Sequence, residues 1–231
     1  MPYQPETKAD HLKQRLRSAL LQGEFEPGQV ISIRKIAQSY QTSVIPARDA
    51  MRGLVAEGAL AFQDSRTIVV PQMTAERMQQ IRFARLSLEP ELVRRAFDHL
   101  NSADLEQLRH IDAGLDQAVA ANDTHAYAQG NYAFHFLIYR RAAAPVLLAL
   151  AETLWLQYAP SMHRICTSFG AAAMACDYHR RALRALERSE RDNFGAALTA
   201  DIQQGMDFII ARLITGPENE TPSQTEAVQH V

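Results

Sequence analysis

This chain of 231 residues has few cysteines, little excess charge of either sign and no long apolar runs. The two cysteines, Cys166 and Cys176, allow one disulfide but no disulfide framework, which is typical of a protein from a reducing compartment. The net charge of −2 excludes a strongly basic, histone-like protein. No apolar run approaches the ~18 residues that span a bilayer, and the first residues lack the apolar core of a signal peptide. We therefore expect a cytoplasmic protein with no membrane partner.

The composition of the chain is that of a globular protein with a mild split of charge. Hydrophobic residues make up 47% of the sequence, enough to bury a core. Residues 1–72 carry nine basic and seven acidic side chains, a net charge of +2, so the remainder carries −4. This asymmetry favours nucleic-acid binding by the first segment but is too small to establish it.

The first segment reads as helices separated by turns. Residues 7–22 have the apolar period of an amphipathic helix, which ends at Gly23. After a turn over residues 26–29, Ser32 is placed to cap a short second helix over residues 33–40.

A third helix begins after Ser43, which can serve as its cap, and Pro46 falls in its first turn, where a missing N–H costs nothing. Residues 59–72 then give two short apolar runs around a polar tip, which predicts a β-hairpin. Three helices followed by a hairpin predict a winged helix-turn-helix over residues 1–72. In that fold the third helix enters the DNA major groove by its N-terminal end.

From residue 74 the apolar period is helical, and glycine and proline are sparse. We expect a break or kink at Pro90 and a helix start at Pro145. The fold class is therefore mainly α, an N-terminal winged helix-turn-helix followed by an all-α antiparallel bundle over residues 73–216. The polar residues 217–231 are expected to form a disordered tail. The expected bundle helices are 74–88, 90–100, 103–121, 124–142, 145–168, 171–188 and 190–214.

The N-terminal segment resembles the GntR family of bacterial transcription regulators. The residues that carry the resemblance are Leu16, Leu20, Gly23, Pro27-Gly28, Ile36-Ala37 and the stretch QTSVIPARDAMRGLVAEGAL. The remainder resembles the ligand-binding FCD domain of the FadR subfamily, through RLSLE at 85–89, NYAFH at 131–135 and His179.

The resemblance implies that the first segment touches DNA through Arg34, Ser43, Arg48 and the wing residue Arg66, with Val44, Ile45 and Pro46 facing the groove. The residues themselves add Arg52, four positions after Arg48 and on the same helix face, as a contact to phosphate or guanine. The alternative for these two arginines is a solvated helix face. Val44 stands where the family usually has an arginine, and Thr67 where it has a glycine, which should soften the reading of DNA sequence.

A metal site is the second implication of the resemblance, held by Asn131, His135, His179 and, in place of a family histidine, Asp201. Asn131 and His135 lie four residues apart and so face the same side of a helix. Two imidazoles with oxygen ligands favour Zn, Ni, Mn or Fe over Ca or Mg. Asn131 replaces a family aspartate, which lowers the ligand charge by one. The alternative is that His135, between Phe134 and Phe136, is a hydrogen-bonded core residue.

These observations predict a DNA-binding regulator that is not an enzyme, most simply a repressor that binds an inverted-repeat operator as a homodimer. A small organic-acid effector would bind the bundle, with Arg85 facing the effector or the domain interface. Arg85 has an alternative role, pairing with Glu89 four residues on. Two other functions stay open: an all-α metalloenzyme built on the Asn131, His135, His179 and Asp201 cluster, and a regulator with a metal-free effector pocket.

Overall fold

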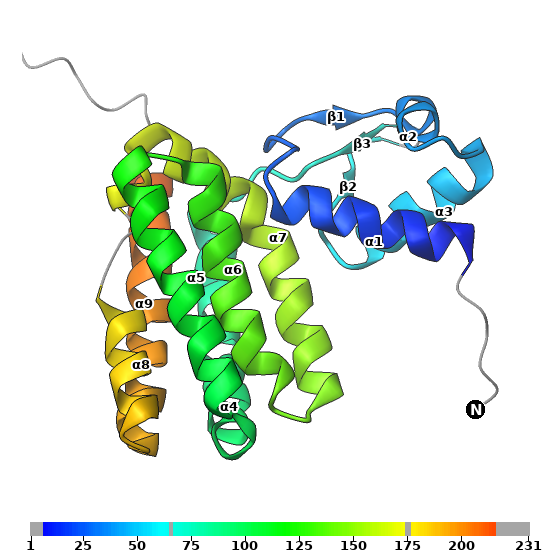
Figure 1. Ribbon diagram of the computed structural model, residues 1–231. Helices are drawn as coiled ribbons and strands as arrows, with labels where there is room; N and C mark the ends of the chain where they lie inside the picture. The colour runs from blue at the N-terminus through cyan, green and yellow to red at the C-terminus, as the bar shows by residue number, and fades with distance from the viewer. Residues whose placement is uncertain (1–6, 65–66, 174–176, 216–231) are drawn as a thin grey trace, which may run out of the picture.

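The computed structural model describes residues 7–64, 67–173 and 177–215, and the expected disordered tail lies outside them. We call the described part of residues 7–72 the head and that of residues 73–215 the bundle. Figure 1 shows the head beside a set of long, roughly parallel or antiparallel helices. Among the described residues no helix is both long and apolar enough to cross a membrane.

The head is the expected winged helix-turn-helix, with one strand more than predicted. Strands β2 and β3 form the expected hairpin, and β3 lies between β2 and β1 in an antiparallel sheet. The strand β1 is only two residues long, too short to leave an alternating pattern in the sequence. The elements are α1 (Lys8–Leu21), β1 (Val30–Ile31), α2 (Ile33–Ser39), α3 (Val44–Ala56), β2 (Ala61–Phe62) and β3 (Ile68–Val69).

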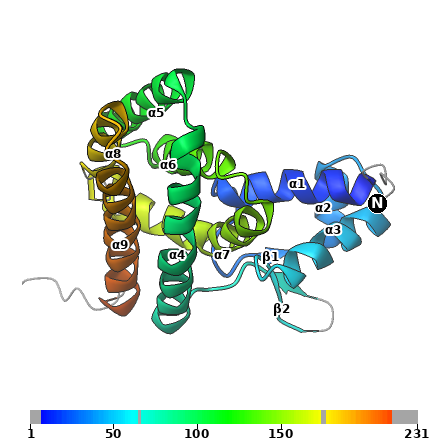
Figure 2. The same cartoon turned by 90° about the horizontal axis from the view of Figure 1, so that it is seen from below.

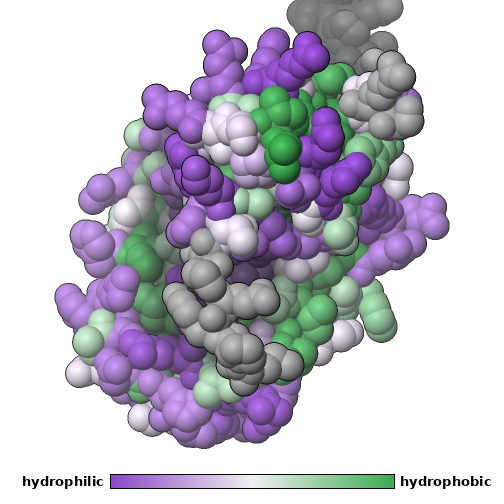
Figure 3. All heavy atoms as spheres, turned by 90° about the vertical axis from the view of Figure 1, so that its right-hand side faces the viewer, coloured by the Kyte–Doolittle hydropathy of each residue, from purple (hydrophilic) through white to green (hydrophobic). Residues whose placement is uncertain are grey.

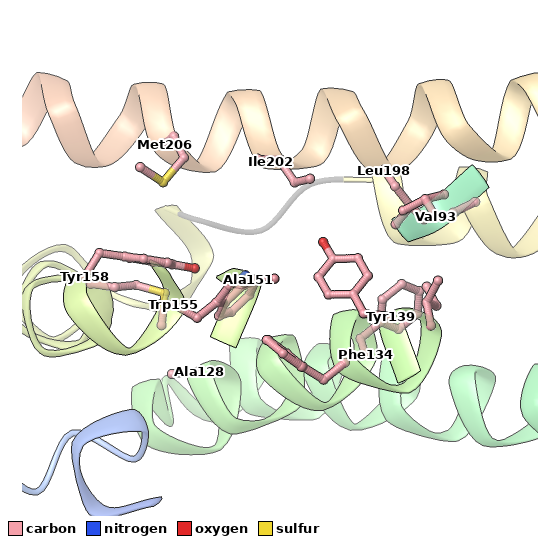
Figure 4. Packing of buried hydrophobic residues seen from close by; sticks show 14 of the residues in the cluster. Val93, Ala128, Phe134, Tyr139, Ala151, Trp155, Tyr158, Leu198, Ile202 and Met206 are labelled. Carbon is pink, nitrogen blue, oxygen red and sulfur yellow. The ribbon is translucent and has the colours of Figure 1, made fainter. Parts of the chain in front are cut away.

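The bundle is helical throughout its described part, as expected, and a large buried cluster of apolar side chains fills it. Figure 4 shows part of this core, where side chains of α6 and α7 face Leu198, Ile202 and Met206 of α9. The elements are α4 (Ala75–Ala96), η1 (Phe97–His99), α5 (Ser102–Ala121), α6 (Thr124–Arg140), α7 (Pro145–Phe169), η2 (Ala171–Ala173), α8 (Tyr178–Glu187) and α9 (Arg191–Thr215).

Two expected helix boundaries were wrong. Helix α4 continues through Pro90, because buried side chains before and after it, Glu89 and Leu92, hold the helix in the core. Packing on both sides thus outweighs the ~3 kcal/mol that an interior proline costs. The helix expected from residue 171 is a short 3₁₀ turn followed by α8, which begins only at Tyr178. Cys166 is a free, buried thiol, and Cys176 lies outside the described residues.

Helix α7 lies between the head and the rest of the bundle and packs on α1 (Figures 1 and 2). Its two faces belong to different cores. Trp155 and Tyr158 are buried in the bundle, whereas the neighbouring Leu156 is fully buried in the apolar cluster of the head. The head and the bundle are therefore joined by a shared helix rather than by a linker alone.

Polar contacts reinforce this junction. The Gln157 side chain donates to the Glu57 carbonyl oxygen at 2.9 Å, at the C-terminal end of α3. His163 Nε2 donates to the Leu21 carbonyl oxygen at 2.8 Å, at the end of α1. Gly23 follows with a positive φ of 74°, and a Cβ there would lie 2.5 Å from the His163 ring. Only glycine fits both the backbone conformation and the close approach of the imidazole.

Leu156→Ala should lower the free energy of unfolding by about 2–5 kcal/mol, because it opens a cavity where α7 enters the head core. Urea denaturation followed by circular dichroism measures this loss. Leu150→Ala on the same helix is the matched control, since Leu150 is half exposed and its truncation leaves no cavity. Equal, small losses in both variants would contradict the role of Leu156 in joining the two cores.

Candidate functional site

Three of the four predicted metal ligands come together in the bundle. His135 on α6, His179 on α8 and Asp201 on α9 each offer a ligand atom, and all three atoms lie within 4.8 Å of one another. Asp201 Oδ2 is 3.0 Å from His135 Nε2 and 3.6 Å from His179 Nε2. Ligands ~2.0–2.1 Å from a tetrahedral ion lie about 3.3 Å apart, so this spacing suits one ion.

The surroundings of the cluster favour a neutral His135 and an ionised Asp201. Burial is the main influence on His135 and lowers its pKa, which favours the neutral imidazole. Burial alone would raise the pKa of Asp201, but the neighbouring His179 and His135 rings outweigh it and hold that pKa well below its usual range. Neutral imidazoles and an ionised carboxylate are the forms that bind metal.

A chain of hydrogen bonds fixes which nitrogen of His135 carries its proton. The Tyr139 hydroxyl donates its only proton to Glu89 Oε2 at 2.6 Å. Tyr139 can therefore only accept from His135 Nδ1, which lies 3.1 Å away. A neutral His135 then turns the lone pair of Nε2 toward Asp201 Oδ2, so two acceptors face each other at 3.0 Å. This contact is favourable only if a cation, a metal ion or a proton, lies between them.

His179 presents a second unsatisfied nitrogen to the same place. Its Nε2 is buried and has no hydrogen-bond partner among the residues that the structure describes. The ring is fixed by stacking on Phe134, with centroids 3.9 Å apart, and Nδ1 lies 3.7 Å from Asp112 Oδ1. Beside it is a cavity of about 30 Å³ lined in part by Asp112, His179 and Asp201, which is room for little more than one ion or water.

Asn131, the fourth predicted ligand, lies one turn before His135 and is half-buried. The contacts above join the other three residues, so a ligand role for Asn131 stays a prediction. The sequence reasoning missed Asp112 and Tyr139. Tyr139 could have been found, because it lies four residues after His135 on the same helix face. Asp112, on α5, carries no sequence signal that links it to His179.

Arg85 lies in a buried polar network, not on an open surface. It pairs with Glu89 through two hydrogen bonds, Nε to Oε1 at 2.6 Å and Nη2 to Oε2 at 3.0 Å. Its guanidinium lies over the Trp155 ring and donates to the Tyr158 hydroxyl at 2.9 Å. Glu89 also accepts from Trp155 Nε1 at 3.1 Å. This arrangement favours the structural role of Arg85, and contact with an effector stays a prediction.

Most of the predicted DNA contacts are exposed on the head. Arg34 on α2 and Arg48 and Arg52 on α3 are exposed, as is the apolar Ile45. Ser43 occupies the N-cap of α3, but its side chain makes no capping hydrogen bond. The first-turn N–H groups of α3 therefore lack the acceptor that a capping serine supplies, which suits the approach of a phosphate.

The remaining predicted DNA contacts fall around the same end of the head. Val44 is exposed and Pro46 half-buried, both in the first turn of α3, whereas Arg66 lies outside the described residues. Figure 3 looks onto this end of the molecule, where hydrophilic side chains surround smaller apolar patches.

Comparison with known proteins matches each part of the chain to a protein family. Residues 80–204 match the FCD domain, and residues 8–70 match the bacterial regulatory proteins of the gntR family. The HTH-type transcriptional regulator McbR of Escherichia coli (strain K12) is 25% identical over 193 residues, which cover 83% of this chain and 87% of McbR. An uncharacterized HTH-type transcriptional regulator of Bacillus subtilis (strain 168), YdhC, is 30% identical over 107 residues, 46% of each chain.

Solved structures show the same fold. E. coli McbR/YncC superimposes with a TM-score of 0.83 at 23% identity, over 90% of this chain and 99% of the other. A candidate GntR transcriptional regulator from Rhodococcus sp. RHA1 gives a TM-score of 0.72 at 19% identity, over 89% of this chain and 99% of the other.

Glu89→Gln should lower the free energy of unfolding by about 3–5 kcal/mol, because it leaves the buried Arg85 guanidinium without a carboxylate. Urea denaturation measures this loss. Arg85→Met combined with Glu89→Gln should recover much of it, since no buried charge is then left unpaired: the amide oxygen can accept from Trp155, and the amide N–H can donate to the Tyr139 hydroxyl.

Glu91→Gln is the control for this pair, because Glu91 pairs with two arginines on the surface of the same helix. It should change stability little. A double variant no more stable than Glu89→Gln alone would contradict the pairing argument.

Proposed function

This chain belongs to the FCD family of transcription regulators with a GntR-type DNA-binding segment, and on that premise we propose that it is a repressor controlled by a small organic acid. The acid would bind in the bundle beside a divalent transition metal. As a homodimer the protein would place two heads on an inverted-repeat operator. The relatives named above are transcription regulators, which favours regulation over the metalloenzyme alternative.

One arrangement carries the metal assignment: His135 Nε2, which the bond from Nδ1 to Tyr139 leaves without a proton in the neutral ring, faces the Asp201 carboxylate, and the buried His179 Nε2 lies beside them. His135, His179 and Asp201 would hold Zn, Ni, Mn or Fe, with Asn131 as the proposed fourth ligand. Relative to the family pattern, the carboxylate has moved from position 131 to position 201, so the set keeps one negative charge. A divalent ion bound there keeps a net positive charge and supplies a Lewis-acid centre for a carboxylate.

Control of DNA binding requires that the bundle and the head respond together, and α7 supports such coupling. Trp155 on its bundle face donates to Glu89, which accepts from Tyr139 and so connects to His135. On its other face, Leu156 and Gln157 contact the head. An effector that shifts α7 would change the placement of the head, and a coupling of 1–3 kcal/mol would change operator affinity ~5–150-fold.

Protein purified without a histidine tag or chelator should contain about one transition-metal ion per chain, or take one up when Zn, Ni or Mn is added. His135→Ala and His179→Ala should each lose the ion, because each removes one of three clustered ligands. Elemental analysis measures the content. His110→Ala is the matched control, since His110 is exposed on α5 and is neither one of the clustered ligands nor a lining residue of the cavity beside them. If no ion binds to the wild type under any of these conditions, the metal-free effector pocket is the better proposal.

Arg48→Ala should weaken binding to a selected operator at least tenfold and leave the fold intact, because Arg48 is exposed on the first turns of α3. Operator duplexes can be selected from a random pool with the wild type. Binding is then measured by fluorescence anisotropy, and folding by thermal denaturation. Arg188→Ala removes an equal charge from the exposed end of α8, a helix on the side of the bundle away from the head (Figure 1), and should leave affinity unchanged. Unchanged operator affinity in Arg48→Ala would rule out α3 as the reading helix.

A further inference from the structure

We infer that the outer face of α1 is a second DNA-backbone site, which takes a phosphate flanking the position read by α3. This inference rests on the proposed DNA-binding function and extends it to residues outside the helix-turn-helix. The site is a surface cavity of about 360 Å³ between α1 and the turn that joins α2 to α3. Its lining residues are Lys8, His11, Leu12, Arg15, Tyr40, Gln41, Thr42 and Ser43.

The cavity is positively charged on one wall and rich in polar groups on the other. Lys8, His11 and Arg15 follow one another at spacings of three and four residues, so they share one face of α1. The opposite wall is the turn Tyr40–Ser43, and no aspartate or glutamate is among the lining residues. A cavity with cationic side chains and hydroxyl groups, and without carboxylates, suits an anion.

Arg15 is held in an orientation that suits phosphate. Its guanidinium lies over the Tyr40 ring, 4.5 Å from the centroid. Stacking fixes the plane of the guanidinium and leaves its N–H edge to donate in two parallel bonds. Because the group is pre-oriented, less rotamer entropy is lost when it binds a phosphate oxygen than for a free arginine.

The position of Ser43 ties this cavity to the DNA-reading helix. Ser43 lines the cavity and is also the N-cap of α3, and its hydroxyl makes no capping bond within the helix. The 13-residue helix α3 directs its positive end here. One phosphate could therefore contact the start of α3, while Lys8 and Arg15 neutralise it or its neighbour from the other side.

The arrangement of the head supports a DNA partner. The N-terminal end of α1, the turn after α2 and the start of α3 lie together at the end of the head away from the bundle (Figures 1 and 2). Arg34 and Arg48 are exposed on α2 and α3 of the same head. A duplex contacted by α3 would thus run past α1, whose two cations add backbone contacts without reading sequence.

The test measures the salt dependence of binding for the full-length protein and a 30-base-pair duplex of random sequence, so that no operator is needed. Each phosphate contact contributes about 0.9 to the slope of log K against log salt. Lys8→Ala combined with Arg15→Ala should lower that slope by about two for each bound protomer. Affinity at low salt should fall about tenfold or more. Affinity for a selected operator should fall by the same factor, since specificity is unaffected.

Two further variants separate the loss of phosphate contacts from a general loss of charge and from unfolding. Arg184→Ala combined with Arg188→Ala removes the same charge from the exposed end of α8, and should leave the slope unchanged. Lys8→Gln combined with Arg15→Gln keeps the apolar stems of both side chains, and thermal denaturation checks that each variant is folded. The glutamine double variant should show the same decrease in the salt slope as the alanine double variant, so the inference can be tested even if the alanine variant unfolds.

Three outcomes would overturn the inference. If the wild type binds DNA and a folded variant of Lys8 and Arg15 keeps the wild-type slope of log K against log salt, the inference about α1 is overturned and the proposed function is not. A wild type that binds neither random nor selected duplexes would overturn the proposed function as well. If millimolar inorganic phosphate raises the melting temperature of the wild type but not of the variant, and the DNA slope is unchanged, the cavity takes a free anion and not the DNA backbone.

Discussion

The buried carboxylate of Glu89 is the constraint on which the bundle depends. A carboxylate removed from water must be met by donors, and Glu89 takes them from three helices. Arg85 comes from its own helix α4, Tyr139 from α6 and Trp155 from α7. Because Tyr139 has one proton and gives it to Glu89, the protonation of His135 is decided as well. The buried Arg85–Glu89 ion pair thus determines, through Tyr139, that Nε2 of a neutral His135 faces Asp201 without a proton.

The same network reaches the head because both faces of α7 are packed at the level of residues 155–158, one against the bundle and the other against the head. Trp155 and Tyr158 pack around Arg85, and Leu156 enters the head core. A change in the bundle that moves Trp155 would move Leu156 with it, since a helix shifts as a unit. The contacts at the C-terminal ends of α1 and α3 would carry that shift to the far ends of those helices, where the proposed DNA contacts lie.

Much of this architecture could be predicted from local sequence, and the parts that could not depend on contacts between distant residues. The helical period, Gly23 and the residues around Ser43 were sufficient for a winged helix-turn-helix before a bundle. The break expected at Pro90 was wrong, because proline chemistry is local whereas the packing around Glu89 and Leu92 is not.

In the candidate site, too, some residues could be predicted from the sequence and others could not. His135, His179 and Asp201 were named from a family pattern, and the structure brings them together. Asp112 and the proton donation by Tyr139 depend on which helices meet, which single-residue patterns do not specify. The basic face of α1 carries no sequence signal that separates it from a solvated helix face, because the contact of Arg15 with Tyr40 depends on how α1 meets the turn after α2.

The central claim is that His135 presents a lone pair, not a proton, to Asp201, and that a cation joins them. Nitrogen-15 NMR of the histidine side chains, recorded on the full chain with one equivalent of zinc, tests this directly. If Glu89 fixes the proton of Tyr139, the proton of His135 will be found on Nδ1, and Nε2 will show the shift of a metal-bound nitrogen. A proton found on Nε2, with Nδ1 bare and zinc present, would mean that His135 simply donates to Asp201. The cluster would then be a hydrogen-bonded part of the core.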